Sequence, residues 1–433
     1  MNGIDTDVFI IGGGIGGLTL AAILRKLNIS CKVLERTERI EPVGAGISLA
    51  PNALKLLDQL GLYEKILQSG QKLHKIQIIR NQTHWNTLDW SLVEKWFGYP
   101  VISTERHNFH RLLYDAAGAE QTVLLNSKVT NIIDNAEEAS VRVILEDGQQ
   151  LRSRLVVGAD GIRSLTRRVL AGAVNDKTTN TIRFTGRVHM SGITSSLEHL
   201  GPEAGGVGNW LLNDDSILTT WPCPDNQQWF IGVTKTNSAI PQDRSVWCNT
   251  TPEMITDVYG ESFHPFAEKG KFSEIVDHSV RILASNVFEE VGFPTMAKGR
   301  IALLGDAAHS MTSFFGQGGC QAIEDAAELA NRLQETLLAS QTKLGDLSPG
   351  EITLMLSEYS EGRQQRVQDL ANFSSNYARL HTADLPLGMG PFLRHMIYRF
   401  VPSAVWMWYL QWLYGHQPSV SALGVRDRQA SHA

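Results

Sequence analysis

The sequence predicts an α/β protein, in which a Rossmann-like domain carries an inserted antiparallel β-sheet domain and is followed by a helical C-terminus. Three observations lead to this class. Near the N-terminus, an apolar strand runs into a glycine-rich turn and a helix. A second apolar strand and glycine-rich turn follow residue 300 and again lead into a helix. Between them, residues 181–281 form short apolar stretches joined by turns, a pattern typical of antiparallel strands.

Length and composition indicate about two domains and an ordinary soluble composition, because 433 residues exceed what one core usually holds. The net charge of -6 argues against a nucleic-acid partner. Four scattered cysteines lack metal-ligand spacing, so we expect no metal site and a reducing compartment. Since no signal peptide is recognisable either, we expect a cytoplasmic protein. The predicted division is a discontinuous first domain (1–75, 100–180 and 282–370), a substrate domain (76–99 and 181–281) and a C-terminal segment (371–433).

The N-terminal unit has the spacing of a dinucleotide-binding motif. The strand Val8 to Ile11 precedes a GxGxxG turn, a helix to about Leu27 and a second strand, Cys31 to Leu34. The first glycine permits a tight turn, the second lets the backbone approach a pyrophosphate, and the third lets helix and strand pack closely. Glu35 follows, placed to accept from a ribose hydroxyl, and Arg36 beside it is a further candidate cofactor-binding residue. These three glycines are Gly12, Gly14 and Gly17. The alternative is that they form a glycine-rich turn in some other kind of α/β protein.

The second glycine-rich unit follows the apolar run Ile301 to Leu304. Asp306 then places a carboxylate at the carboxyl end of a strand, where ligands bind in open α/β sheets. The helix after it is opened by Gly316, Gly318 and Gly319. Bare backbone N–H groups and the positive helix end can therefore approach an electron-rich ligand.

Three further segments complete the pattern. A loop of small residues, including Gly46, leads to a helix from Asn52 to Leu60. Ser103 to Arg106 is predicted to begin another helix. A hydrophobic strand ends in Gly158-Ala159-Asp160-Gly161, which projects one carboxylate into a crevice.

Together these motifs, in this order, resemble the single-component FAD-dependent (group A) aromatic hydroxylases, which include salicylate hydroxylase, para-hydroxybenzoate hydroxylase, urate hydroxylase and zeaxanthin epoxidase. The resemblance implies a para-hydroxybenzoate hydroxylase-like fold and bound FAD. It implies that Arg106 contacts the FAD phosphates and ribityl chain, that Asp160 approaches the pyrophosphate, and that Gly46 lies against the isoalloxazine ring. The second glycine-rich unit, with Asp306, resembles the family's second flavin-binding motif.

The reaction implied by the resemblance is a monooxygenation. NADPH or NADH reduces FAD, O₂ gives a flavin C4a-hydroperoxide, and this species hydroxylates or epoxidises a small aromatic or polycyclic substrate, such as a secondary metabolite. No second complete GxGxxG unit is visible, so we expect NAD(P)H to bind transiently. A flavin-dependent dehydrogenase or reductase, or a redox-sensing flavoprotein, remains an alternative. A flavin-dependent halogenase would carry GWxWxIP, which does not occur here. Whether the protein is a monomer or a homodimer is left open.

For the substrate side, Arg187 is the candidate catalytic residue. Strand alternation predicts that Thr185, Arg187 and His189 share one face of the β domain. An arginine there could bind a carboxylate or phenolate or donate a proton, although an outward surface charge is the alternative. We expect one face of that sheet to meet the flavin and the other to meet water. Many relatives have a proline where this chain has Ser313, and we expect Ser313→Pro to be tolerated.

The C-terminal segment from Phe392 to Tyr414 is rich in Trp and Tyr. Pro402 and Gln411 interrupt it, and its apolar run is shorter than the ~20 residues that span a bilayer. Either it caps the substrate pocket, as similar tails in the family do, or it contacts a membrane surface through its aromatic and basic side chains. We favour capping.

Overall fold

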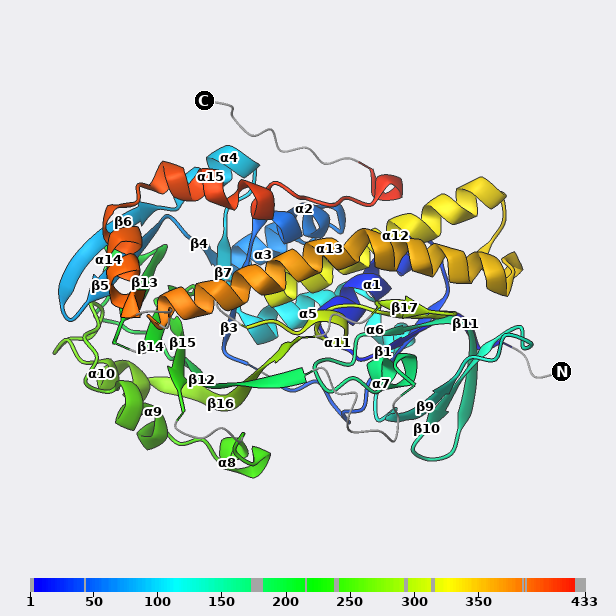
Figure 1. Cartoon of the computed structure of the whole chain (residues 1–433), viewed down its shortest axis with the longest axis horizontal. Coiled ribbons are helices and arrows are strands. Elements are labelled where there is room, and N and C mark those ends of the chain that lie inside the picture. The colour runs from blue at the N-terminus through cyan, green and yellow to red at the C-terminus, as the bar shows by residue number, and fades with distance from the viewer. Residues whose placement is uncertain are drawn as a thin grey trace.

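The computed structural model describes residues 4–42, 44–172, 182–214, 216–236, 241–291, 295–312, 316–383, 385 and 388–424. Two large sheets and a long helical layer make up the molecule (Figure 1). The predicted α/β class, with a Rossmann-like sheet, an antiparallel sheet and C-terminal helices, is confirmed.

The first sheet is mainly parallel. Its strand order is β17 (Ala297–Lys298), β18 (Ile301–Leu303), β11 (Gln150–Gly158), β1 (Thr6–Ile11), β2 (Cys31–Leu34) and β8 (Val123–Leu124). The pairs β18–β11, β11–β1, β1–β2 and β2–β8 are parallel, so their carboxyl ends lie along one edge. A hairpin, β9 (Val129–Ile133) and β10 (Val141–Leu145), joins β11 antiparallel. The helix α1 (Ile15–Lys26) follows β1 as the glycine spacing predicts.

The second sheet joins an early hairpin to the central part of the chain. Its order is β16 (Ser279–Glu290), β12 (Ile182–Thr194), β15 (Gln228–Lys235), β14 (Ser216–Pro222), β13 (Val207–Leu212), β5 (Lys75–Arg80) and β6 (Thr83–Asp89). All neighbours are antiparallel except β13 and β5, which are parallel. The ranges 76–99 and 181–281, which were assigned to the substrate domain, therefore both contribute strands to one sheet.

The expectation that one face of this sheet meets water is wrong. Three helices, α8 (Arg244–Cys248), α9 (Pro252–Tyr259) and α10 (Phe272–Asp277), lie beside the sheet, and α9 and α10 form a second hydrophobic core with it. Phe230 packs edge-on against Phe272, with ring centroids 5.0 Å apart. The ring of Tyr259 fills the space beside Gly232, which has no side chain. Burial of these aromatic rings stabilises the inserted domain from the side away from the first sheet.

A small third sheet corrects one helix start. Its strands are β3 (Gly46–Leu49), β7 (Ile102–Glu105) and β4 (Gly70–Lys72). Residues 103–105 were predicted to open a helix, but they pair with β3 and β4, and α5 (Arg106–Ala116) begins at Arg106. This strand pairing satisfies the backbone N–H and C=O groups of the segment. A short polar sequence does not by itself predict such pairing.

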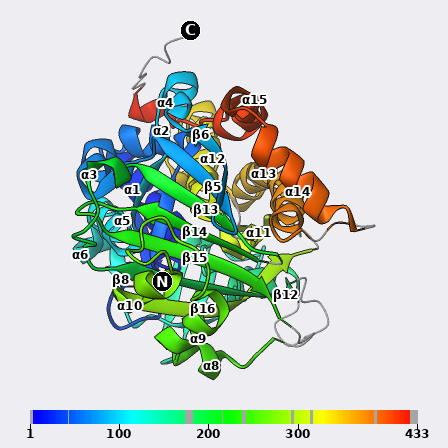
Figure 2. The same ribbon diagram turned by 90° about the vertical axis from the view of Figure 1, so that its left-hand side faces the viewer.

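The remaining helices cover the sheets. They are α2 (Pro51–Gln59), α3 (Tyr63–Ser69), α4 (Ser91–Phe97), α6 (Ala119–Thr122), α7 (Leu165–Leu170), α11 (Asp306–His309), α12 (Gln317–Ser340), α13 (Pro349–His381), α14 (Gly390–Phe400) and α15 (Ser403–Tyr414). The long helices α12 and α13 run side by side, and α14 and α15 lie at the outer edge of the molecule (Figures 1 and 2). Within the described ranges, no helix is long and apolar enough to cross a bilayer.

Candidate active site

The first glycine turn lies against the end of strand β11. Gly12 has φ +105°, and a Cβ there would lie 2.5 Å from the carbonyl oxygen of Ala159. A Cβ on Gly17 would lie 2.1 Å from the carbonyl oxygen of Gly12. At Gly14, the N-cap of α1, no atom of the described residues other than its chain neighbours lies within 4 Å of the missing Cβ. The turn is therefore closed on its protein side and open at Gly14, beside the positive end of the helix.

The carboxylate of Glu35 supports this turn. Its Oε2 accepts from the Gly13 N–H at 2.8 Å, and its Oε1 accepts from the Thr37 N–H at 2.9 Å. Arg36, which follows it, is exposed. On the other side of the peptide, His110 donates through Nε2 to the Gly13 carbonyl at 2.7 Å. Burial lowers the pKa of His110, which favours the neutral ring. His110 was missed from the sequence, because a lone histidine on a helix carries no recognisable motif.

Asp160 lies near this turn, but its carboxylate is used locally. Ser164 Oγ donates to its Oδ1 at 2.5 Å, and the Thr166 N–H donates to its Oδ2 at 3.1 Å. The second bond satisfies an N–H of the first turn of α7, and the first bond holds Ser164, the N-cap of that helix. The backbone of Asp160 lies 3.1 Å from where a Gly12 Cβ would stand. The structure therefore places Asp160 beside the first glycine turn, with both carboxylate oxygens already accepting hydrogen bonds.

Arg106 and Asp306 bring the middle of the chain to the second glycine unit. The side chain of Arg106 lies over Gly44, where a Cβ would stand 2.6 Å from its Cδ. Burial lowers the pKa of the Arg106 guanidinium, and the charge of Asp306 raises it in part, which places the two groups within electrostatic reach. Asp306 is exposed at the start of α11, and its Oδ1 lies 3.9 Å from a Cβ on Gly318.

The second glycine unit packs close to the first. Gly316, with φ +65°, is the N-cap of α12. A Cβ on Gly319 would lie 2.9 Å from Ile47 and 3.5 Å from Ile15, the first residue of α1. The N-terminal ends of α1 and α12 therefore lie near each other, on the side where strands β1, β11 and β18 end. Ser313, the predicted departure from the family, lies outside the described residues.

Behind this unit lies a buried polar network that the sequence did not reveal. Asp325 on α12 accepts from the Gly305 N–H at 2.8 Å, from His309 Nε2 at 2.5 Å and from Arg363 Nε at 2.8 Å. Burial alone would raise the pKa of Asp325, but His309 and Arg363 lower it to about 2. Arg363 also donates to Glu324 at 3.1 Å. These residues range from Gly305 to Arg363 along the chain, so only the packing of α12 on α13 brings them together.

Arg187 lies on the face of the second sheet that turns toward the first domain. Its strand neighbour Val188 packs in the core formed with α9 and α10, so Arg187 points the other way. On that same face Ile193 packs with Ala45 and Trp229. Arg187 is half-buried, and its Nη1 donates to the Thr185 carbonyl at 3.4 Å.

Two details of strand β12 differ from simple alternation. Gly186, with φ +69°, sits in a bulge between Phe184 and Arg187, so Thr185 is separated from the regular part of the strand. His189 keeps the alternation with Arg187, and its Nδ1 lies 3.5 Å from Ser285 Oγ. Within the described residues its buried Nε2 has no hydrogen-bond partner, and burial lowers the pKa of His189 to about 4.

Contacts between the second sheet and the small-residue loop explain Gly46. A Cβ on Gly46 would lie 2.1 Å from the ring of Trp229, and Trp229 Nε1 donates to Ser103 Oγ at 2.8 Å. Trp221 stacks on Trp229 at 5.8 Å. Arg281, also missed from the sequence, donates to the Gly44 carbonyl at 3.0 Å and pairs with Glu105 at 2.6 Å. These contacts fix the second sheet against the loop.

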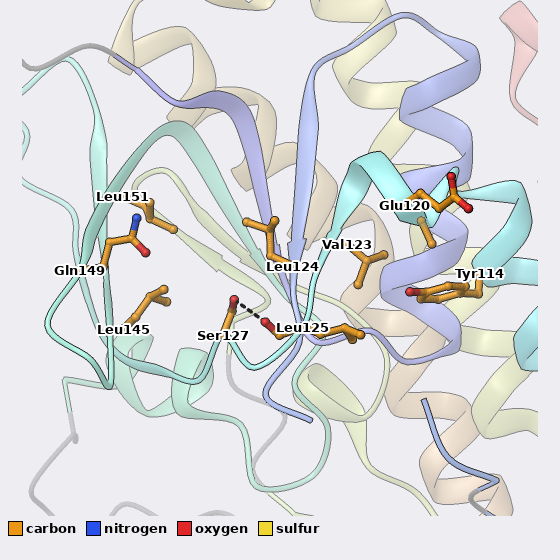
Figure 3. A pocket seen from close by; sticks show the side chains of 10 residues that line it. Tyr114, Glu120, Val123, Leu124, Leu125, Ser127, Leu145, Gln149 and Leu151 are labelled. Carbon is orange, nitrogen blue, oxygen red and sulfur yellow. Dashed lines mark hydrogen bonds between the residues drawn. The ribbon is translucent and has the colours of Figure 1, made fainter. Parts of the chain in front are cut away.

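A separate depression of about 560 Å³ lies beside β8 and the β10–β11 hairpin (Figure 3). Leu124, Leu145 and Leu151 line it together with Tyr114 and Gln149. None of the predicted site residues does so, and it is therefore distinct from the candidate active site.

Solved structures share this architecture. Klebsiella pneumoniae HpxO complexed with FAD and uric acid superposes with a TM-score of 0.79 at 22% identity, covering 95% of this chain and 97% of HpxO. A salicylate hydroxylase substrate complex gives 0.72 at 20% identity, covering 96% and 97%. At such identities the likeness shows the fold, which is that of para-hydroxybenzoate hydroxylase-like flavoprotein monooxygenases.

Sequence comparison gives the family. A family model described as an FAD binding domain matches residues 5–374, and the chain belongs to this family. FAD-dependent monooxygenase pynG of Aspergillus niger is 50% identical over 96% of this chain and 97% of its own length. FAD-dependent monooxygenase olcE of Penicillium canescens is 29% identical over 92% and 85%. The protein is an FAD-dependent monooxygenase, as its motifs predict.

Proposed function

We propose that this monooxygenase uses NADH or NADPH and O₂ to hydroxylate or epoxidise a small aromatic or polycyclic molecule in secondary metabolism. The observation that carries the proposal is the meeting of both glycine units with Arg106 and Asp306 at the strand ends, beside the second sheet. The organisms named for the relatives, Aspergillus and Penicillium, are fungi, which supports a tailoring role for a related enzyme here.

The residues at this edge fit FAD. Gly14 leaves its side of the turn open, as close approach of a pyrophosphate to the backbone requires. Glu35 carries a carboxylate for a ribose hydroxyl, and Arg106 carries a cation for phosphate. The N-terminal end of α12, at Gly318 and Gly319, suits an electron-rich ring. Bound FAD would supply electron transfer and O₂ activation, which side chains do not provide.

The protein's own part is to bind and orient the substrate and to exclude water. We propose that Arg187 binds an oxygen of the substrate, because its face of β12 turns toward the first domain. We also propose that α14 and α15 cover the substrate site as a lid. Trp406 of α15 and Tyr398 of α14 pack edge-on against Trp210 of β13, with centroids 6.5 and 5.9 Å apart. An apolar lid of this kind keeps water from the reacting groups.

Substitution of Arg187 tests the substrate side. We expect Arg187→Ala to keep full FAD content and to lower substrate-stimulated NAD(P)H oxidation by at least about tenfold, since a charged hydrogen bond would be lost. Arg183→Ala is the matched control, because Arg183 lies on the same strand, is exposed and pairs with Glu289. Full turnover in Arg187→Ala would contradict the role of Arg187.

The reaction itself is tested under ¹⁸O₂. The purified protein would be incubated with NADH or NADPH and a panel of aromatic and polycyclic compounds. We expect substrate-stimulated oxidation of the nicotinamide and one labelled oxygen in the product. Product without the label, formed also without O₂, would contradict the proposal and indicate a dehydrogenase or reductase.

A further inference from the structure

Helices α14 and α15 each carry a row of exposed apolar side chains. On α14, Phe392, Met396 and Phe400 recur every four residues, and Phe392 is 61% exposed. On α15, Val405, Trp408 and Trp412 recur at three-to-four spacing, and Trp408 is 70% exposed. This spacing places each row along one side of its helix. We call these six residues the outer face of α14–α15.

The outer face is not needed for the fold. The opposite sides of the same helices are already packed, since Tyr398, Met407 and Leu410 are fully buried in the main core. The residues of the outer face keep between 37% and 70% of their surface exposed; Trp412 is the least exposed, because its ring packs edge-on against Phe373 of α13. Figures 1 and 2 show both helices at the outer edge of the molecule. Large aromatic side chains gathered in this way mark a contact surface.

The charge of this segment indicates what it contacts. Residues 388–424 contain no Asp or Glu, although the whole chain has a net charge of -6. Arg399 is exposed and lies over the ring of Phe400, 5.9 Å from its centroid. Trp and Tyr rings are amphipathic and favour the level of lipid headgroups. An acid-free surface with an exposed arginine avoids repulsion by anionic lipid. Its aromatic rings favour a lipid headgroup layer over a soluble acidic partner, because such a partner offers no interface of this kind.

We propose that the outer face of α14–α15 docks on the surface of an anionic phospholipid bilayer. The helices would lie in the plane of the interface, with their apolar rows inserted and their buried sides still packed on the protein. Because those buried sides cover Trp210, docking would bring the lid of the proposed substrate site next to lipid. A lipophilic substrate dissolved in the bilayer would then be close to the enzyme that oxidises it.

Vesicle co-sedimentation of the purified full-length protein tests this proposal. The test variant is Phe392→Gln/Phe400→Gln/Trp408→Gln, which removes three exposed side chains. The matched control is Leu338→Gln/Leu354→Gln, because these leucines are 69% and 62% exposed on other helices. We expect wild type and control to pellet with phosphatidylserine-containing vesicles and more weakly with phosphatidylcholine alone. The test variant should partition at least about tenfold less, since three apolar side chains no longer leave water.

Three results would overturn the proposal: no pelleting of wild type, an unchanged partition of the test variant, or equal binding to both lipids. A wild-type dimer that the test variant converts to a monomer, without vesicle binding, would assign the face to a second copy of the chain and also overturn it. Turnover of a water-soluble substrate without vesicles should be the same in all three proteins. Its loss in every protein would concern the proposed reaction and not the docking surface.

Discussion

At the scale of single residues, two glycines of the same turn make opposite predictions. Gly12→Ala should destabilise the protein by more than about 1 kcal/mol, because φ is +105° and the Cβ would stand 2.5 Å from a carbonyl oxygen. Gly14→Ala should leave the stability of the FAD-free protein within about 0.5 kcal/mol, because no atom of the described residues, its chain neighbours aside, lies within 4 Å of the added Cβ and its φ is -79°. Its methyl group would enter the space proposed for a pyrophosphate and weaken FAD binding at least about tenfold.

Urea unfolding of the FAD-free proteins and titration with FAD measure the two effects separately. If Gly14→Ala bound FAD like wild type, the proposed position of the pyrophosphate would be wrong. If both variants lost stability equally, the turn would have no room for a side chain at Gly14.

The residues of this site differ in how far the sequence predicts them. Glycines are readable because a missing side chain has one steric meaning at each position of a known spacing, as at Gly12 and Gly17. The side chains that hydrogen-bond to the backbone of these turns cannot be predicted in this way. The side chains of His110 and Arg281 act on peptide groups of Gly13 and Gly44, and only the fold makes those pairs neighbours.

At the scale of elements, the buried contact between α12 and α13 holds the second glycine unit in place. Arg363→Met should cost about 3–5 kcal/mol, because it leaves Glu324 and Asp325 buried with fewer compensating charges. Arg332→Met is the control, since Arg332 pairs with Glu335 at the surface and should cost less than about 1 kcal/mol. Chemical denaturation compares the two. A similarly small cost for both would show that the network does not lock the helices.

Elements were predictable where period and turn chemistry agree. The strand Cys31–Leu34 has the bounds expected from its apolar run, and the strand Thr6–Ile11 contains the expected run Val8 to Ile11. Ser103 to Arg106 were predicted to begin a helix because polar residues precede a helical pattern there, whereas strand pairing decides the conformation of residues 103–105. The packing of α9 and α10 on the second sheet was missed, because alternation shows which side chains share a face of a strand but not what packs against that face.

At the scale of the whole molecule, buried histidines predict acid sensitivity. Burial lowers the pKa of His264 to about 3 and that of His381 to about 3. The unfolded chain binds protons near pH 6.5 whereas the folded protein does not, so stability is complete above that pH and falls below it. Each histidine lowers stability by about 1.4 kcal/mol per pH unit between pH 6.5 and 3.

His264→Asn tests this linkage through the slope of stability against pH and not through its value. His264 shares a hydrogen bond with Thr220 Oγ1 and accepts one from the Phe266 N–H, so the variant loses stability at every pH. Its free energy of unfolding should nevertheless fall by about 1.4 kcal/mol less per pH unit between pH 6.5 and 5 than that of wild type. Parallel curves would contradict the neutral state of His264.

The last prediction concerns the C-terminal helices, whose two sides have different tasks. Truncation after Gly390 should prevent stable folding, because it removes Tyr398, Met407 and Val420 from the main core. The carbonyl oxygen of Val420 also accepts a hydrogen bond from Gln59 Nε2 at 3.2 Å. The helices therefore pack as part of the fold, which is the basis of the proposed lid.

Two point variants separate this packing from the outer face. Leu410→Ala should cost about 2–5 kcal/mol, since Leu410 is fully buried. Trp408→Ala, two residues earlier and 70% exposed, should cost less than about 0.5 kcal/mol. Thermal and urea unfolding measure both. A soluble, folded truncation, or equal losses in the two variants, would show that α15 is attached to the molecule without being part of its core.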